Sequence, residues 1–583
     1  MKNFEVARQF ELMADVLELK GQNPFRIRAY RRAAQSLESL SEDLEAVARE
    51  DRLEDIPGVG ADLAGKIQEY LRVGKIKEIA AASKGIPHGV VELMNIPGVG
   101  PRTARLLYER EHVTDIRQLE KLASKGGLRG LPGIQAKTEQ NILKGIRLVR
   151  GSQERMPLGH ALPLGRELVR ALERLSAAKQ VSLAGSIRRM KETVGDIDIL
   201  VTSSKPAAVM QAFVTLPQVA EVLERGTTKA SIRHREGIQV DLRVVDPECF
   251  GAALVYFTGS KQHNIHVRDI GVKKGFKISE YGVFRASTGR RLASATEAEV
   301  YAAVGLPWIP PELREDAGEI EAALQRKLPR LVELDEIRGD LHCHTNATDG
   351  HHTIEALVTA AERRGYKYVA VTDHSPSTRV TGGLTAEELA AHVKKIRAVQ
   401  ARHPRITVLA GSECDILPDG SLDYPDRVLA GLDLVIGSVH TGFRQSRAEM
   451  TRRICRALAH PHMHVLGHPT GRLIGEREPY AVDIDEVLRT ARRHDKAVEI
   501  NCQPDRLDLD DVHARRAHEL DVLLAVSTDT HMLDHLGLME LGVATARRGW
   551  TETRRVVNTW PAAKLLGWLR AERAAPARAA HGR

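Results

Sequence analysis

Cysteine and aromatic residues are scarce in this chain of 583 residues, and long apolar runs are missing. The five cysteines are scattered without a CxxC pair, which argues against a disulfide framework and for a reducing compartment. With only 4% aromatic residues, stacking on aromatic platforms is not expected to dominate any binding of single-stranded nucleic acid. No apolar run is long enough to span a membrane, and the first residues are typical of an amphipathic helix rather than a signal peptide. We therefore expect a cytoplasmic protein without a membrane partner.

The composition that is present is that of an ordinary globular protein, with 42% hydrophobic and 28% charged residues. The length suggests about four domains. Lysine and arginine number 85 against 77 aspartate and glutamate residues, which gives a formal net charge of +8. This mildly basic balance fits a polyanionic partner but does not require one.

A repeated Pro-Gly-apolar-Gly turn marks the N-terminal part of the chain. It occurs in LEDIPGVGADLAGKIQEYL, again in LMNIPGVGPRTARLLYER, and in a weaker third form in LRGLPGIQAKTEQNILKGI. Each copy predicts a helix-hairpin-helix unit, in which the amides around Gly58, Gly60, Gly98 and Gly100 face an anion. DNA backbone phosphate is the natural ligand, although a lone PGVG also suits a helix–helix corner. Gln135 replaces the second glycine of the third copy, which favours a packing role there.

The segment LAGSIRRMKETVGDIDIL, residues 183–200, places two carboxylates on one face of a predicted strand. Asp196 and Asp198 are two residues apart, so their side chains converge. Mg²⁺ suits such a pair because it binds one or two carboxylates plus substrate phosphates. Gly185 and Ser186 precede them in a turn where backbone amides can approach a phosphate. The alternative is a solvated Asp-x-Asp in a surface turn.

Asp241 stands in the middle of another predicted strand, IQVDLRVV, where a buried carboxylate needs a partner charge. It is the natural third member of a set with Asp196 and Asp198. Three acids on adjacent strands can hold two divalent ions about 4 Å apart, which is the arrangement for in-line phosphoryl or nucleotidyl transfer.

In this order, GSIRR, GDIDIL, VDLR and YFTGSKQHNIHVR resemble the X-family DNA polymerases, from the first residues to about Pro311. The resemblance implies helical lyase-like and fingers domains, a palm and a thumb. It implies that Asp196, Asp198 and Asp241 bind two ions, Mg²⁺ or Mn²⁺, and that Asp241 takes the proton of the primer 3′-hydroxyl. The residues that it places on the incoming nucleotide are Arg155, Gly185, Ser186, Arg189, Gly195, Tyr256, Phe257, Gly259 and Asn264.

The same resemblance extends to DNA contacts and to the first helical domain. Arg268 falls where the family contacts the template, and Arg26 and Tyr30 fall near a 5′-phosphate pocket. Lys66 matches the Schiff-base lysine of members with lyase activity. Asp62 occupies a position that is basic in those enzymes, so a solvated surface lysine remains the alternative for Lys66.

After residue 338, predicted strands and helices alternate, and potential metal ligands stand at the carboxyl ends of the strands. This placement is typical of the active face of a β/α barrel. The candidate ligands are His342, His344, Asp349, His374, Glu413, His440, His468, Asp529 and His531. Imidazoles and carboxylates together suit Zn²⁺, Mn²⁺ or Fe, and a cluster of this size predicts two or three ions that can ionise water.

These motifs are similar to the PHP (polymerase and histidinol phosphatase) family over roughly 337–570, and the ligand set looks complete. The resemblance implies a phosphoesterase fold with a distorted barrel, binding Mn²⁺ and/or Zn²⁺. An X-family polymerase followed by a PHP domain is the arrangement of the bacterial PolX group. Members of that group couple synthesis to a Mn²⁺-dependent 3′→5′ exonuclease.

We therefore predict a multidomain protein with all-α helix-hairpin-helix domains, an α+β nucleotidyltransferase palm with a thumb, and a C-terminal TIM-like PHP barrel. The predicted domains are 1–82 lyase-like, 83–155 fingers, 156–246 palm, 247–315 thumb, 316–336 linker, 337–571 PHP and 572–583 a disordered tail. Residues 151–160 are expected to form a linker, and 312–336 a charged helical connector.

The predicted function is the filling of short gaps in DNA repair, including base excision repair, with 3′-end processing by the barrel. Abasic-site incision or removal of a 3′-phosphate are further expectations for the barrel. The predicted partners are gapped or nicked DNA and dNTPs, with the protein a monomer at the bacterial nucleoid. Two alternatives stay open: a barrel that hydrolyses a small phosphomonoester, and a DNA-end scaffold without catalysis.

Overall fold

The computed structural model describes residues 2–574 except for 39, 41, 85, 86, 97, 98, 133, 136, 137, 141, 144 and 147–154. The chain divides into two compact units. The first unit comprises Met1–Arg155 with Val214–Asp241, and the second comprises Met156–Phe213 with Leu242–Arg583. Within the described residues, none of the helices combines the length and apolarity needed to cross a bilayer.

The first unit is mainly helical. Its helices are α1 (Lys2–Leu19), α2 (Pro24–Glu38), α3 (Leu44–Arg49), α4 (Ala61–Val73), α5 (Lys77–Ser83), α6 (His88–Glu92), α7 (Pro101–Glu111) and α8 (Ile116–Ser124). In α1, Val6, Phe10, Met13 and Leu17 recur at helical spacing and are buried. They join a hydrophobic cluster that spans α1 to α5, and a second cluster covers the segment from α6 to Ile146. The helices of this unit therefore form two hydrophobic cores, one around α1 to α5 and one from α6 to Ile146.

Both predicted hairpins have helix-hairpin-helix geometry. Gly60 is the N-cap residue of α4 and Gly100 is the N-cap residue of α7, and a single 3₁₀ turn precedes each hairpin. Gly58 is exposed, whereas Gly98 lies outside the described residues. α4 and α7 thus each begin directly after a glycine, as the sequence predicted, and the contact of these turns with an anion stays a prediction.

The first unit also contains strands. β5 (Val219–Arg225) pairs antiparallel with β6 (Lys229–His234), and β7 (Gln239–Val245) begins in this unit. Val240, Leu242 and Val244 of β7 are buried, while the alternating residues between them are half-buried. This period of two gives Asp241 a place on the more open face of its strand.

The second unit begins with the palm segment. Its elements are β1 (Met156–Pro157), α10 (Leu158–Glu173), β2 (Gln180–Leu183), α11 (Gly185–Arg188), β3 (Thr193–Val194), β4 (Asp196–Thr202) and α12 (Pro206–Val214). β2 pairs antiparallel with β4. The linker expected at 151–160 is wrong at its end, because Leu158 and Ala161 are buried and α10 starts at Leu158. Residues 151–154 lie outside the described part.

The thumb segment follows in the same unit. It contains α13 (Phe250–Thr258), α14 (Lys261–Lys273), β8 (Phe276–Ser279), β9 (Gly282–Arg285), β10 (Arg291–Ala293), α15 (Glu297–Ala303) and α16 (Glu319–Leu324). The charged helical connector expected at 312–336 is wrong. Only α16 is α-helical there, and Arg314, Glu319 and Ile320 are fully buried. Glu319 accepts a 2.6 Å hydrogen bond from His263 on α14. This buried carboxylate therefore fixes the segment to α14 and is not exposed to solvent.

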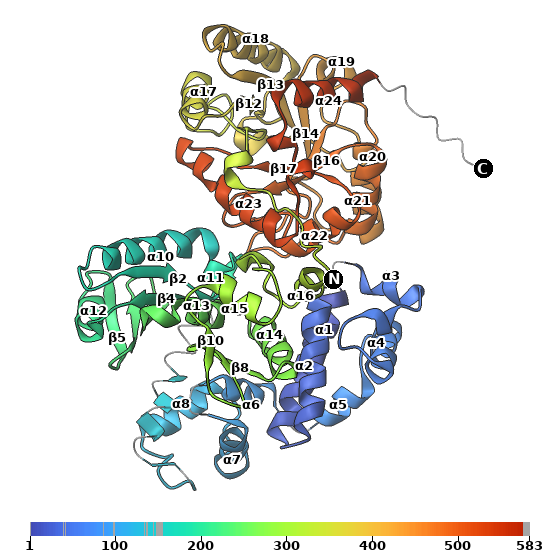
Figure 1. The fold of residues 1–583 in the computed structure, drawn as a ribbon. Helices are drawn as coiled ribbons and strands as arrows, with labels where there is room; N and C mark the ends of the chain where they lie inside the picture. Colours follow the sequence, from blue (N-terminus) through green and yellow to red (C-terminus); the bar gives the residue numbers. More distant parts are fainter. Residues whose placement is uncertain are drawn as a thin grey trace. The chain divides into compact units, whose positions relative to one another are not determined.

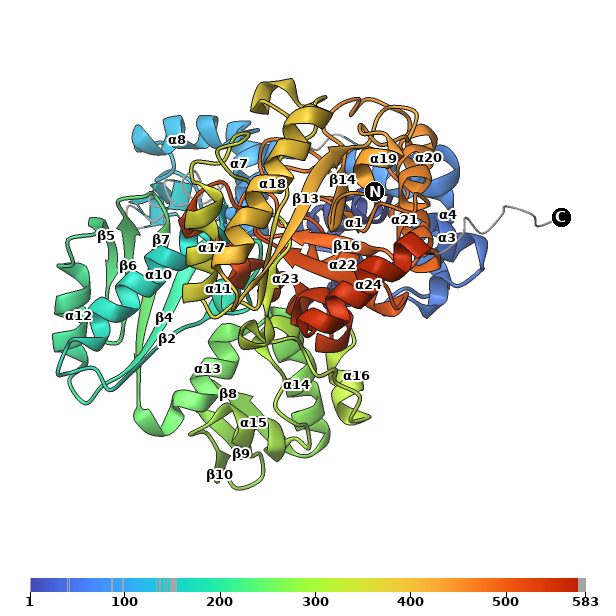
Figure 2. The ribbon, with the colours of Figure 1, turned by 90° about the horizontal axis from the view of Figure 1, so that it is seen from above.

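A seven-stranded parallel sheet forms the barrel, with strand order β11 to β17 in sequence (Figures 1 and 2). The strands are β11 (Gly339–Asp340), β12 (Tyr368–Val371), β13 (Thr407–Asp415), β14 (Leu434–Ser438), β15 (Val465–Leu466), β16 (Ala497–Asn501) and β17 (Leu523–Ser527). The helices are α17 (Ile354–Arg363), α18 (Ala386–Arg402), α19 (Asp426–Leu429), α20 (Arg447–Leu458), α21 (Ile484–Arg493), α22 (Asp511–Glu519), α23 (Met539–Arg548) and α24 (Ala562–Ala574).

Alternating strand residues build two cores in the barrel. Tyr368 and Ala370 join an inner cluster with Trp560 and Trp568, whereas Val369 and Val371 join the outer cluster beneath the helices. The Tyr368 hydroxyl donates to the Asn558 carbonyl at 2.7 Å, which fixes the C-terminal segment to the barrel. α24 continues to Ala574, past the start of the tail predicted at 572–583, and residues 575–583 lie outside the described part.

The first and last strand ends of the barrel are joined directly. Cys343 and Thr530 form a parallel bridge, in which the His344 amide donates to the Thr530 carbonyl at 2.9 Å. This closure brings the histidines after β11 beside the residues that follow β17. The TIM-like architecture predicted from the sequence is confirmed, and its carboxyl-terminal edge carries the site described next.

Candidate metal centre and nucleotide site

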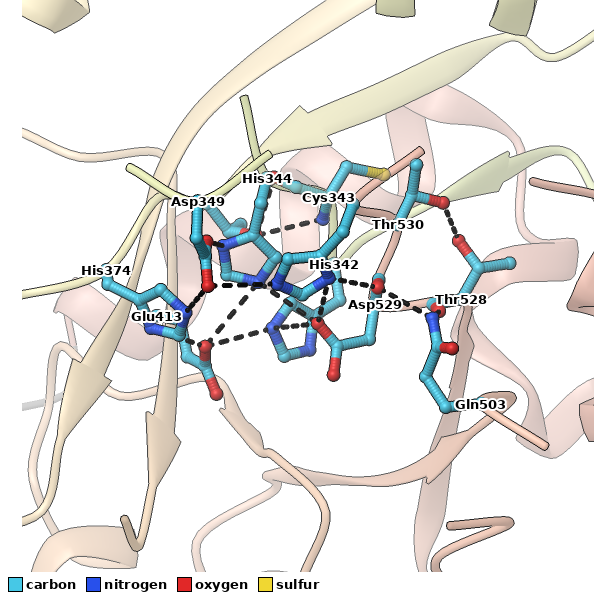
Figure 3. Close-up of polar contacts among 12 residues, drawn as sticks. His342, Cys343, His344, Asp349, His374, Glu413, Gln503, Thr528, Asp529 and Thr530 are labelled. Carbon is cyan, nitrogen blue, oxygen red and sulfur yellow. Dashed lines mark hydrogen bonds and ion pairs between the residues drawn. The ribbon is translucent and has the colours of Figure 1, made fainter. Parts of the chain in front are cut away.

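Glu413, at the end of β13, is the centre of the barrel site (Figure 3). Its side chain is 1% exposed. Its carboxylate oxygens lie within 3.5 Å of nitrogen atoms of His342, His344, His374, His440 and His468. One buried carboxylate surrounded by imidazoles from several strands is the arrangement that the strand-end motifs predicted.

Two further carboxylates complete the cluster. Asp349 lies 3.4 Å from His374 and 3.2 Å from His531, and Asp529 lies 3.1 Å from His344. Three overlapping groups have ligand atoms within 4.8 Å of one another: His344–Asp349–His374–His531, His342–His344–Asp529, and His374–Glu413–His440. His468 is outside these groups but contacts Glu413 at 2.9 Å. The structure thus brings together all nine residues predicted as ligands.

The donor atoms of this cluster fit a metal centre. The buried side-chain atoms without a hydrogen bond of good geometry include His342 Nε2, both ring nitrogens of His344, His374 Nδ1, His468 Nδ1 and Asp529 Oδ1. Leaving such groups unsatisfied costs about 1–3 kcal/mol each. Nitrogen and carboxylate donors together are the ligands of Zn²⁺, Mn²⁺ and Fe. His468 and Asp529 also have φ angles of 23° and 51°, a strained backbone that concentrates at functional sites.

The electrostatics of the cluster favour paired charges. Burial alone would lower the pKa of His374, but Glu413 and Asp349 raise it to about 10. Glu413 and Asp415 likewise raise the pKa of His440 to about 9 against the effect of burial. The imidazoles around Glu413 hold the pKa of that carboxyl well below its usual range, although burial opposes this. A metal ion would displace protons from these imidazoles, so metal binding here releases protons.

A second row of carboxylates, not predicted from the sequence, orients the imidazoles. Glu499 accepts from His342 Nδ1 and from the His468 amide, each at 2.7 Å. Asp415 lies 2.8 Å from His440 Nδ1. Such contacts fix the tautomer of a ligating histidine, which leaves its other nitrogen for the metal.

Two sequence signals could have identified these residues. Glu499 stands in AVEIN, in the middle of an apolar strand, which is the argument that singled out Asp241. Asp415 stands two residues after Glu413, on the same strand face. Asp373, the neighbour of His374, accepts a hydrogen bond from the Thr345 amide at 2.8 Å. It therefore fixes the loop after β11 that carries His342 and His344.

The palm strand places Asp196 and Asp198 on one face. Both are half-buried, while the alternating Ile197 and Ile199 are buried. Gly185 has a φ of +62°, and a Cβ atom there would lie 2.2 Å from Asp198 Oδ2, so only glycine fits. The Gly-Ser turn therefore packs directly against Asp198, where a phosphate-binding turn was predicted.

Asp241 lies on β7 and is half-buried. Its carboxylate accepts a hydrogen bond from the side-chain nitrogen Nε2 of Gln239 at 3.1 Å. It belongs to the first unit, whereas Asp196 and Asp198 belong to the second. The three-carboxylate cluster therefore stays a prediction. Arg155 is exposed and precedes β1, also at the end of the first unit.

Several residues predicted to bind the nucleotide are linked by hydrogen bonds. Arg189 donates to the Thr258 carbonyl, next to Gly259. Asn264 donates to the Tyr256 carbonyl at 2.7 Å, and Arg268 donates to the Asn264 carbonyl at 3.2 Å. This chain of contacts runs from α11 through the end of α13 into α14.

The remaining predicted nucleotide residues lie near these elements. The Phe257 ring packs edge-on against the Tyr256 ring. The Arg243 guanidinium lies over the Phe257 ring, with its Cζ atom 4.5 Å from the ring centre. Ser186 on α11 and Gly195 before β4 are half-buried. Contact of these residues with a nucleotide stays a prediction.

Lys66 is neither solvated nor a free amine. It is 8% exposed, forms an ion pair with Asp62, and lies 3.1 Å from Glu78. Burial would lower its pKa, but the hydrogen bonds to Asp62 and Glu78 raise it. A Schiff-base nucleophile needs an unprotonated amine, so this environment opposes lyase chemistry. Arg26 also pairs with Glu78, and Tyr30 is buried.

Family models match five segments of the chain. The matches are a helix-hairpin-helix domain at 1–76, a SAM-like helix-hairpin-helix tandem at 90–148, the DNA polymerase beta palm at 155–240, the DNA polymerase beta thumb at 253–315 and the PHP domain at 340–503. The predicted kinds of domain are confirmed.

Known proteins resemble either the whole chain or parts of it. The DNA polymerase/3′-5′ exonuclease PolX of Bacillus subtilis is 39% identical over 560 residues, which cover 96% of this chain and 97% of that protein. DNA polymerase lambda of Rattus norvegicus is 28% identical over 54% of this chain and 56% of its own. A probable phosphatase of Caldicellulosiruptor saccharolyticus is 32% identical over 28% of this chain and 64% of its own.

Palm, thumb, helix-hairpin-helix and PHP domains in one chain define the class of X-family DNA polymerases with a PHP domain. The chain belongs to the bacterial PolX family within this class.

Proposed function

We propose that this protein is a DNA-directed DNA polymerase that fills short gaps in repair and trims 3′ ends with its barrel. The observation that carries the proposal is the coexistence of the Asp196–Asp198 strand, packed on Gly185, with nine assembled ligands in the barrel. The helix-hairpin-helix domains support DNA as the partner, since Gly58, Gly60 and Gly100 of their turns are exposed and glycine turns at helix starts suit backbone phosphate.

In the polymerase half, Asp196, Asp198 and Asp241 would hold Mg²⁺ or Mn²⁺, which neutralises charge on the transferred phosphoryl group. Asp241 would accept the proton of the primer 3′-hydroxyl. Ser186 and Arg189 would donate to the triphosphate, where fixed positive donors stabilise the developing charge. The segment Tyr256–Gly259 would lie against the sugar and disfavour a 2′-hydroxyl.

In the barrel, the nine ligands would hold two or three ions, Mn²⁺ and/or Zn²⁺, which ionise water and stabilise charge on a phosphate oxygen. Glu499 and Asp415 keep the imidazoles of His342 and His440 in place for this task. We assign the 3′→5′ exonuclease to this centre. Abasic-site incision and 3′-phosphate removal are chemically open to the same ligands.

A second candidate for the barrel is hydrolysis of a small phosphomonoester. The match to a probable phosphatase, confined to 28% of this chain, favours it. A labelled primer on a gapped duplex, with and without dNTPs, tests the main proposal: extension with dNTPs and shortening without them are expected with Mn²⁺. A barrel that cleaves p-nitrophenyl phosphate far faster than the primer would support the second candidate.

We further propose a monomer in the cytoplasm that works at the nucleoid on gapped or nicked DNA with dNTPs. The scaffold alternative is disfavoured, because a scaffold would have no need of an intact ligand set with its own row of orienting carboxylates.

A further inference from the structure

Arg189 of the palm, Glu315 of the thumb segment and Arg548 of the barrel form an ion-pair triangle. Glu315 Oε1 accepts from Arg189 Nε and from Arg548 Nη1, each at 3.0 Å. The side chains are 13%, 20% and 4% exposed, respectively. All three charges are thus largely withdrawn from water, where removing one partner has large consequences.

Arg548, on α23, also holds the main chain of residues 185–192, the segment with Ser186 and Arg189 that we call the nucleotide turn. Its Nη1 donates to the Arg189 carbonyl at 2.8 Å, and its Nε donates to Asp511 Oδ2 at 2.8 Å. A second barrel contact lies three residues further along, where Arg472 donates to Glu192 at 2.7 Å. The loop from Arg189 to Glu192 is therefore held at both ends by the barrel.

Glu315 is charged at neutral pH. Burial alone would raise its pKa, but Arg548, Lys191 and Arg189 lower it to about 2. The carboxylate therefore competes with any other anion for the Arg189 guanidinium. Arg548 supplies a second positive charge on the same oxygen, so Glu315 keeps a partner when Arg189 turns to another anion.

We propose that Arg548 and Glu315 are positioning residues through which the barrel sets the affinity of the polymerase half for dNTPs. This inference rests on the proposed function, in which Arg189 contacts the triphosphate. Glu315 competes with the triphosphate for Arg189, and Arg548 weakens the Glu315–Arg189 interaction by sharing the carboxylate. Without Arg548, Glu315 would retain Arg189 and the triphosphate would lose a donor.

The test is gap filling by four variants of the full-length protein: R548A, R548K, E315Q and the double variant R548A/E315Q. We expect R548A to raise KM for dNTP about tenfold with little change in kcat, a typical size for coupling between sites. E315Q is expected to lower KM, because the competing charge is gone. The double variant is expected to return KM to within about threefold of wild type, and R548K to rescue part of the loss.

Arg547→Ala is the matched control, because the neighbouring Arg547 pairs with Glu312 and Glu333 and does not contact the nucleotide turn. Shortening of labelled single-stranded DNA without dNTPs reports whether the barrel is intact. If R548A does not fold, E315Q decides: a lowered KM supports the inference and a raised KM overturns it. A double variant as weak as R548A, or KM unchanged in every variant, also overturns it. A wild type that extends no primer refutes the proposed function, and this inference with it.

Discussion

The barrel centre and the palm strand are two solutions to holding divalent ions. In the barrel, eight other predicted ligands surround Glu413 in a largely buried cluster, and Glu499 and Asp415 orient the imidazoles. On the palm strand, Asp196 and Asp198 are half-buried and share one face. In our proposal the barrel supplies a complete ligand set itself, whereas the palm leaves coordination positions for substrate phosphates. We infer that the barrel binds its metal without DNA, and that the palm site is completed by the incoming nucleotide.

The largest expected effect is on the palm strand. Replacing both acids in D196N/D198N removes the two charges that we propose bind the ions, so gap filling should fall by at least about a thousandfold. Primer shortening without dNTPs should remain within about twofold of wild type. Gel analysis of a gapped duplex measures both, and loss of the nuclease together with synthesis would break the comparison.

The corresponding change in the barrel is Glu413→Gln, which keeps the shape of the side chain but removes the charge shared by five imidazoles. Nuclease activity is expected to drop by about a thousandfold, with extension preserved. Metal content after desalting is a second measurement, because the variant should retain fewer ions per chain than wild type. Equal metal content in both proteins would mean that Glu413 is no ligand.

A smaller effect is expected one layer further out. Glu499→Gln keeps a hydrogen-bond acceptor near His342 but removes the charge, so we expect nuclease activity to fall about 10- to 100-fold. Rescue by raised Mn²⁺ concentration would show that the defect is in metal affinity. Thr545→Val is the control, because the buried Thr545 hydroxyl donates to the Leu541 carbonyl within its own helix, α23.

The smallest effect concerns an ion pair in the thumb segment. His266 lies 2.8 Å from Asp316, and this hydrogen bond is the main cause that raises the pKa of His266. A raised pKa in the folded state stabilises the protein below the unfolded pKa near 6.5, and this stabilisation is lost as pH rises through the folded value. Asp316→Asn should therefore lower Tm by about 1–2 °C at pH 6 and hardly at pH 9, as scanning fluorimetry would show. Equal losses at both pH values would exclude a charged pair.

The sequence predicted that the nine candidate ligands of the barrel lie together, because strand periodicity and strand-end motifs are local features. The motif TDH after β12 and the motif GSEC in β13 can each be recognised locally. That they meet in space follows from the rule that side chains at the carboxyl ends of barrel strands lie together. Glu499 could have been found by the same local argument. The role of Glu315 could not be predicted from the sequence. Its partners Arg189 and Arg548 are far from it in the chain and come into contact with it only through tertiary packing.

Charge patterns misled the sequence interpretation at the connector. Residues 312–336 carry many charges, which usually indicates a solvated helix, yet Arg314 and Glu319 are buried and paired. Their partners His263 and Glu297 lie on other elements of the thumb. Lys66 is a similar case. Its ion pair with Asp62 is local to α4, but its contact with Glu78 depends on how α4 and α5 pack.

The most direct test of two separate active sites in one chain is a single gel with a labelled primer on a gapped duplex. Wild type, D196N/D198N and E413Q are each incubated with Mn²⁺, with and without dNTPs. We predict that wild type extends the primer with dNTPs and shortens it without them, that D196N/D198N only shortens it, and that E413Q only extends it. A single set of substitutions that removes both activities would contradict the account.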